Sequence, residues 1–130
     1  MASIEDSIAR AALDWFAHAE PLVREQVRAC RTVARETTPS GFFTQLEVPT
    51  DFEQLSLPEN FALDGCAIFA EQLDTYAECI LHIHNGRVSS LEVHSVGSGH
   101  PRTCQAFEVR DIDVNRIDQR DGLSDGPPAD

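Results

Sequence analysis

Residues 76–96 consist of two runs rich in aliphatic and β-branched residues, in which apolar and polar positions largely alternate, separated by Asn85-Gly86. Such alternation is typical of a strand with one buried face. An Asn-Gly pair between two such runs indicates a tight turn, because both residues tolerate a positive φ. The stretch therefore predicts a β-hairpin, and it is the strongest structural signal in the chain.

The length of the hairpin loop decides which side chains face the core. A two-residue loop pairs His84 with Arg87 and places the apolar residues of the first strand beside polar ones of the second. A three-residue loop with a bulge at Gly86 gathers most of the apolar residues on one face, namely Cys79, Leu81, Ile83, Leu91 and Val93, together with Ser89. Register follows the buried face, so the bulged loop is expected. The opposite face then carries Glu78, His82, His84, Glu92 and His94, with Ile80 and Val88 as exceptions.

Helical spacing dominates the first 36 residues. The first apolar stripe consists of Ile4, Ile8, Ala12, Trp15 and Ala19, and the second of Val23, Val27, Cys30 and Ala34. Ser3 and the acids after it fit a helix N-terminus, whereas Pro21 favours a break. The pattern predicts one helix over about 4–18 and another over about 21–36, with a single kinked helix as the alternative.

Four arginines would share one face of the second predicted helix: Arg24, Arg28, Arg31 and Arg35. A basic stripe can bind nucleic acid. In a chain with a net charge of −12, however, we interpret it as a solvated face that pairs with the chain's own acids, such as Glu20 with Arg24. Nucleic-acid affinity comes largely from cationic contacts, so no nucleic-acid partner is expected.

The remaining pattern predicts strands without intervening helices. Residues 42–48 form a first strand, and 61–63 with 65–70 form a second that bulges near Asp64-Gly65. The hairpin follows, and then a last strand that contains Phe107, Val109, Ile112 and Val114. Helices followed by strands predict an α+β fold, with two N-terminal helices packed on one face of a four- to five-stranded, mostly antiparallel sheet.

Length and composition favour a single domain over residues 1–117 with a disordered acidic tail at 118–130. No apolar run is long enough to span a membrane, and the N-terminus lacks the pattern of a secretory signal. The four cysteines are widely spaced, which favours reduced, mostly buried thiols over a disulfide scaffold or a zinc site. These features predict a cytoplasmic protein.

Acidic residues are distributed unevenly. Residues 41–75 contain seven acids and no base, more than half of the net charge of −12. Net charge bears on partners rather than on fold, and this block favours a basic protein partner. The candidate contact residues are Asp51, Glu53, Glu59, Asp64, Glu71 and Asp74.

Other chemistry has weaker support in the sequence. His82, His84 and His94 could ligate a metal, but in the expected register His94 lies opposite Glu78, roughly 13 Å along the strand from His82. Glu78 and Glu92 are diagonal neighbours on an open face, which favours solvated carboxylates over an acid–base pair. A G-x-S-x-G match at 122–126 has no strand before it and no histidine after it. We therefore predict no catalytic residue, no metal and no cofactor.

The hairpin segment Asn85-Gly86-Arg87-Val88-Ser89-Ser90-Leu91-Glu92-Val93 resembles a turn-and-strand signature. The signature is Asn/Asp-Gly-Arg-aliphatic-Ser-x-Leu-Glu-aliphatic, found in many small acidic bacterial proteins of uncharacterised function. Some proteins of this kind are immunity proteins, which neutralise a co-encoded toxin. The resemblance implies an inhibitor and assigns no catalytic residue.

The sequence thus predicts an acidic binding protein, an immunity-type inhibitor of a basic toxin domain, and not an enzyme. Two alternatives stay open: an acidic housekeeping domain without a toxin partner, and a metal-binding or enzymatic module built on the histidines. The oligomeric state is left open.

Overall fold

The computed structural model describes residues 3–112. Its elements, in chain order, are α1 (Ile4–Ala19), η1 (Pro21–Val23, a 3₁₀ turn), α2 (Arg24–Ala29), β1 (Arg31–Thr37), β2 (Gly41–Glu47), β3 (Asn60–Phe69), β4 (Tyr76–His84), β5 (Arg87–Val96), η2 (Pro101–Thr103, a 3₁₀ turn) and β6 (Glu108–Asp111). The predicted tail at 118–130, the G-x-S-x-G match and Val114 lie outside the described residues.

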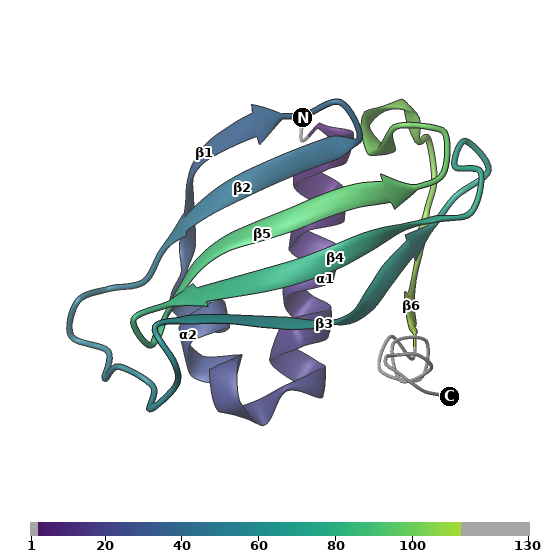
Figure 1. Cartoon of the computed structure of the whole chain (residues 1–130). Coiled ribbons are helices and arrows are strands. Elements are labelled where there is room, and N and C mark those ends of the chain that lie inside the picture. Colours follow the sequence, from purple (N-terminus) through teal and green to yellow (C-terminus); the bar gives the residue numbers. More distant parts are fainter. Residues whose placement is uncertain (1–2, 113–130) are drawn as a thin grey trace.

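The strands form one antiparallel sheet in the order β1-β2-β5-β4-β3-β6. Helix α1 runs across one face of this sheet, and α2 lies beside the end that carries the β4–β5 turn (Figure 1). The predicted α+β class with N-terminal helices is therefore confirmed. The described part of the sheet has six strands, one more than the upper limit expected from the sequence.

Helix α1 begins as its sequence predicts. The Ser3 hydroxyl accepts a hydrogen bond from the Asp6 amide, and the Asp6 carboxylate accepts one from the Ser3 amide. This reciprocal cap satisfies amide groups that would otherwise lack partners. The face packed on the sheet carries Ile8, Ala12 and Phe16, all fully buried.

The second predicted helix, 21–36, is wrong beyond Ala29. Cys30 is extended, and residues 31–37 form edge strand β1 paired with β2. Thr32, Val33 and Thr37 are β-branched and suit a strand, and pairing with β2 satisfies the backbone in a way that local periodicity does not reveal. Arg31 and Arg35 consequently lie on a strand, and the four arginines do not share a helical face.

The hairpin combines a two-residue turn with the apolar pairing expected of the bulged loop. Leu81 pairs with Leu91 and Cys79 with Val93, as expected for the bulged loop. The bulge, however, is at Ser89 rather than Gly86, and the turn itself has two residues, Asn85 and Gly86, with φ of 51° and 75°. A bulge at Ser89 brings Val88 onto the buried face as well, which a bulge at Gly86 would prevent.

The other strands lie close to their predicted positions. Strand β2 begins one residue earlier than expected, and β3 has its predicted irregularity, since its register shifts between Leu63 and Cys66 and Gly65 has a φ of 101°. Strand β6 is short and pairs with β3. None of the helices in residues 3–112 is long and apolar enough to cross a membrane.

Candidate functional site: an acid-rimmed groove

The structure divides the six predicted contact acids into separate groups. Asp51, Glu53 and Glu59 lie in the connection between β2 and β3, beside the β4–β5 turn, whereas Glu71 and Asp74 lie in the turn between β3 and β4. These two groups lie at opposite ends of β3 (Figure 1), which at ten residues is about 33 Å long. Asp64 lies between them, at the bulge of β3.

Asp51 and Glu53 belong to a groove that sequence reasoning missed. The groove has a volume of about 490 Å³ and lies between η1, α2 and the segment 51–55. Its lining residues are Leu22, Glu25, Gln26, Asp51, Phe52, Glu53 and Leu55. We call it the acid-rimmed groove, because three exposed carboxylates surround a floor of apolar side chains.

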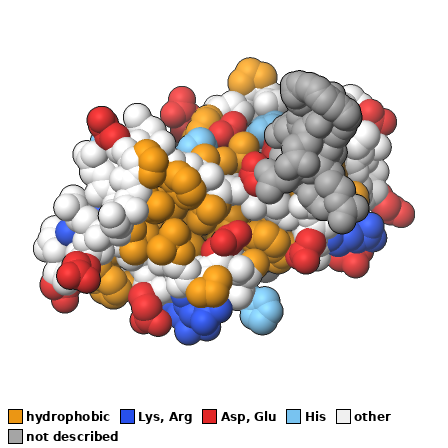
Figure 2. All heavy atoms as spheres, turned by 60° about the horizontal axis from the view of Figure 1, so that its bottom comes forward, with side chains coloured by type: hydrophobic (Ala, Val, Ile, Leu, Met, Phe, Trp, Pro, Cys, Tyr) orange, Lys and Arg blue, Asp and Glu red, His pale blue; other side chains and the backbone are white. Residues whose placement is uncertain are grey.

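The floor of the groove is unusually accessible for apolar residues. Leu22 is 51% exposed, and Phe52 and Leu55 are half-buried. Figure 2 shows one face of the molecule, on which hydrophobic side chains gather in a patch with acidic side chains within and around it. The sequence held one signal for this groove: Leu22 is apolar yet falls outside both helical stripes. Apolar surface bordered by charge is the usual composition of a protein-binding surface.

A buried glutamine holds the groove in shape. Gln26 is 3% exposed, and its Nε2 donates hydrogen bonds to the carbonyl oxygens of Glu53 and Gly86, both at 3.1 Å. Its Oε1 accepts a hydrogen bond from the Val88 amide at 2.9 Å. One side chain thus ties α2 to both the 51–55 segment and the β4–β5 turn.

Further bonds fix the same connection to the hairpin. The Leu55 amide donates to the Gly86 carbonyl, and the Asn85 amide donates to the Glu59 carbonyl, both at 2.8 Å. The Arg87 guanidinium donates to the carbonyl oxygens at positions 49 and 50, both at 3.3 Å. The acids of the groove are therefore presented by a supported loop, which lowers the entropy lost on binding.

The three acids of the rim are available to a partner. Within residues 3–112, none of Glu25, Asp51 and Glu53 forms an ion pair with an arginine or histidine. Each side chain is exposed. The negative charge at this end of the sheet is thus directed to solvent rather than neutralised internally.

The histidines expected on the open face of the sheet pair with acids. His82 Nε2 lies 2.9 Å from Glu92 Oε1, and His94 Nε2 lies 3.3 Å from Glu78 Oε1. His94 Nδ1 is 3.4 Å from Glu92 Oε2 without the geometry of a hydrogen bond. The expected pairing of His94 with Glu78 is confirmed. His84 is separate and bonds Asn60 Oδ1 at 2.9 Å.

These histidines do not form a metal site in the described part of the chain. No group of three or more His, Cys, Asp or Glu side chains in residues 3–112 has the geometry to hold a metal ion. Glu78 lies beside His94, and Glu92 lies beside both His82 and His94. The open face is instead a row of alternating acidic and imidazole side chains.

Most of the four arginines singled out in the sequence bind groups within the protein. Arg24 donates to the carbonyl oxygens of Ala17 and His18, at 2.7 and 3.1 Å, and so caps the C-terminus of α1 rather than pairing with Glu20. Arg31 pairs with Glu47 across β1 and β2, and Arg35 pairs with Asp6. The hydrogen bond and charge of Arg35 lower the pKa of the Asp6 carboxyl. Arg28 is the exception.

The cysteines lie apart from the groove, and three of them are buried. Cys66 and Cys79 face each other on β3 and β4, where contact with Cys66 and burial raise the pKa of the Cys79 thiol. Burial also raises the pKa of the Cys30 and Cys104 thiols. A thiol with a raised pKa holds little thiolate at neutral pH, so Cys30, Cys79 and Cys104 are not activated nucleophiles.

Thiol titration checks this arrangement. We expect Ellman's reagent to modify only half-buried Cys30 in the folded protein, slowly, and all four thiols after unfolding in guanidinium. A Cys30→Ala variant should then show almost no reaction while folded. Rapid modification of Cys66 or Cys79 would contradict their burial in the core.

No protein-family model, no curated protein and no solved structure matches this chain. Within residues 3–112, fold and site define a class: an α+β domain with a six-stranded antiparallel sheet and an acid-rimmed groove at one end.

Proposed function

We propose that this chain is an acidic binding protein, an immunity-type inhibitor that acts in the cytoplasm by covering a basic toxin domain. The acid-rimmed groove carries the proposal, because it combines unpaired carboxylates, exposed apolar surface and a supported backbone. It requires no catalytic residue, metal or cofactor of this chain.

The chemistry of the groove favours lysine or arginine side chains of a partner. Both have a long aliphatic stem and a charged head. The stem can cover Leu22 and Phe52 while the head approaches Asp51 or Glu53. Apolar burial then stabilises the complex by about 25 cal/mol per Å², and the charges add specificity.

The overall charge acts before contact is made. A protein with a net charge of −12 attracts a basic partner over several ångströms, which raises the association rate and makes that rate depend on salt. Rapid capture suits an inhibitor that must neutralise a toxin soon after it appears. An acidic domain without such a partner would show no saturable, salt-dependent binding.

Removing two charges from the groove tests the proposal. A toxin-like reading frame beside this chain's gene would supply the partner, and its basic product would be used with the catalytic residue inactivated. We expect Asp51→Asn combined with Glu53→Gln to slow association roughly tenfold at low salt and to flatten its salt dependence. Stopped-flow measurements at several salt concentrations give both quantities.

The matched control removes two charges from the far end of β3. Glu71→Gln combined with Asp74→Asn changes the net charge equally, but lies outside the groove. It should retain most of the association rate, and both variants should unfold at the denaturant concentration of the parent. Equal slowing by the two variants would mean that only net charge matters and that the groove is not the contact site.

A further inference from the structure

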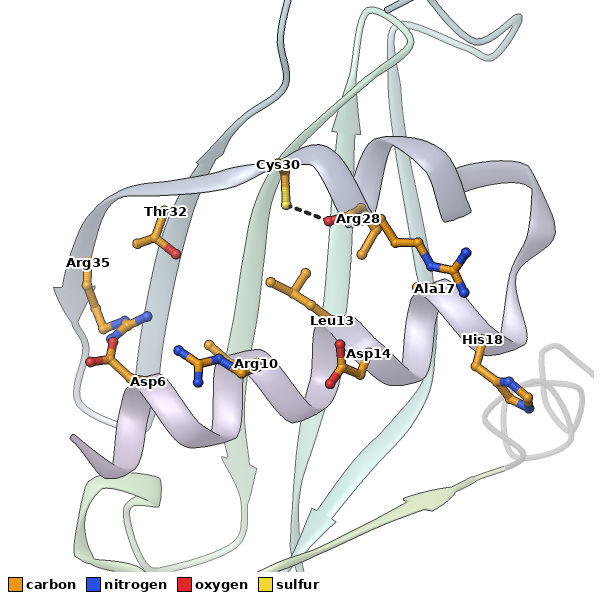
Figure 3. Close-up of a pocket in the computed structure, with 12 residues that line it drawn as sticks. Asp6, Arg10, Leu13, Asp14, Ala17, His18, Arg28, Cys30, Thr32 and Arg35 are labelled. Carbon is orange, nitrogen blue, oxygen red and sulfur yellow. Dashed lines mark hydrogen bonds and ion pairs between the residues drawn. The ribbon is translucent and has the colours of Figure 1, made fainter. Parts of the chain in front are cut away.

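A second groove lies on the other side of α2, between α1 and β1. It has a volume of about 560 Å³, which is within the range of small-molecule sites. Its floor is apolar and consists of Ala9, Leu13, Ala17 and Val27, and Cys30 and Thr32 line its wall. We call it the arginine groove, because Arg10, Arg28 and Arg35 also line it (Figure 3).

The groove exists because small and polar side chains occupy positions that larger apolar ones normally fill. Two of the α1 residues that face it are alanines. On β1, the side chains directed to the helical side are Thr32, Arg35 and Thr37, since these pair with the buried Leu46, Thr44 and Phe42 of β2. An edge strand with polar residues on its inner face leaves a hollow that water or a ligand must fill.

Two arginines of this groove are not used by the fold. Within residues 3–112, Arg10 and Arg28 form no hydrogen bond or ion pair, whereas Arg35 is bound to Asp6 and Thr44. The chain has 22 acids for 10 basic residues, so unpaired arginines on both sides of one hollow are unexpected. A guanidinium is suited to bidentate binding of a carboxylate.

The two free arginines are directed to different parts of the groove. Figure 3 shows Arg10 pointing toward the Asp6–Arg35 pair and Arg28 pointing toward the end of α1 near His18. Arg10 and Ala17 are seven residues apart on α1, a rise of about 10 Å. The two guanidinium groups thus point apart along the groove, which suits a ligand with two separated anionic groups rather than a single small anion (Figure 3).

We propose that the arginine groove binds a small organic dianion whose two carboxylates lie at opposite ends of an apolar chain. One carboxylate would meet Arg10 and the other Arg28, with the chain lying over Leu13 and Ala17. Asp14 and Asp6 also line the groove. Asp14 lies between the two arginines along α1 and disfavours negative charge in the middle of the ligand (Figure 3). Asp6 is paired with Arg35 at the Arg10 end of the groove.

The inference is independent of the proposed function. Within α2, Glu25 and Gln26 line the acid-rimmed groove, whereas Val27 and Arg28 line the arginine groove. No residue lines both grooves, so a ligand in one contacts none of the side chains that line the other.

Linear dicarboxylates of increasing length are the probes. Isothermal titration calorimetry at constant ionic strength should give an affinity that rises from succinate to sebacate. Sebacate should bind at least tenfold more tightly than decanoate, which has the same chain length and one carboxylate. Binding should shift the NMR signals of Leu13 and Thr32 more than those of residues at the β4–β5 turn.

Single arginine variants identify the contacts. Arg10→Gln and Arg28→Gln should each weaken sebacate binding about tenfold, equivalent to about 1.4 kcal/mol, and remove its advantage over decanoate. Arg102→Gln is the control, because Arg102 is exposed on η2 and does not line the groove, and it should leave binding unchanged. The proposal is overturned if sebacate shows no heat of binding, binds no better than decanoate, or is weakened equally by the control.

Discussion

Gly86→Ala is expected to lower the free energy of unfolding by about 3 kcal/mol or more, one of the two largest effects among the variants considered. Gly86 is buried in the turn with a φ of 75°. A Cβ at this position would lie 2.4 Å from the carbonyl oxygen of Leu55 and 2.7 Å from its nitrogen. Both are backbone atoms, so no side-chain rotation relieves the collision, and the 51–55 segment must move away from the turn.

Gly65→Ala is the matched control. Gly65 also has a positive φ, of 101°, but the nearest atom to an added Cβ is Trp15 Cη2 at 3.5 Å, an ordinary contact. This variant should lower the free energy of unfolding by about 1–2 kcal/mol, the cost of backbone strain alone. Guanidinium denaturation measured for both variants separates strain from collision. Equal losses would show that the contact between Gly86 and Leu55 is loose in solution.

Gln26→Leu should lower the free energy of unfolding by about 2–4 kcal/mol, the second of the two large effects. Leucine has a similar size but no polar atoms, so the Val88 amide and the Glu53 carbonyl would lose their hydrogen bonds to this side chain. Buried polar groups without partners are costly because they have lost water as well. The loop would also lose the support that holds Asp51 and Glu53 in place.

Two measurements separate these consequences of Gln26→Leu. Denaturation gives the loss of stability, and amide hydrogen exchange should show faster exchange in the 51–55 segment than in the parent. Gln45→Leu, at an exposed position of β2, is the control and should change neither quantity appreciably. If Gln26→Leu were as mild as this control, the three hydrogen bonds would not be important for the fold.

Local sequence signals predicted the parts of the fold that are stabilised by residues close together in the chain. The Asn85-Gly86 turn, the strands beside it and the capped start of α1 all depend on residues close in sequence. The α+β class followed from the order of these elements. The bulge at Ser89 escaped prediction because its position depends on how well Val88 packs against elements far away in the chain.

The second helix illustrates the opposite case. Residues 21–36 have helical spacing of apolar and basic residues, but residues 31–37 are stabilised as a strand by pairing with β2. Strand β2 is itself held by pairing with β5, and the local sequence of residues 21–37 contains no sign of either partner. Tertiary pairing therefore overrides local propensity at this position.

The candidate groove could be predicted only in part. Asp51 and Glu53 were among the acids expected to contact a partner, because an excess of charge is visible in composition. Their grouping with Leu22 and Glu25, and their separation from Glu71 and Asp74, require the fold. The role of Gln26 was not predictable, since its bonds join residues up to 62 positions apart.

The two outer strands of the described sheet bear on how the protein meets other chains. An open sheet exposes unpaired backbone groups along its borders, and these can recruit a strand from another molecule. Here β1 has a register shift near Val33 and carries Arg31 and Glu36, and β6 has four residues, of which Glu108, Arg110 and Asp111 are charged. Irregularity, charge and short length all discourage growth of the sheet by strand addition. These features favour association through side chains, such as those of the acid-rimmed groove, over the pairing of edge strands between two molecules.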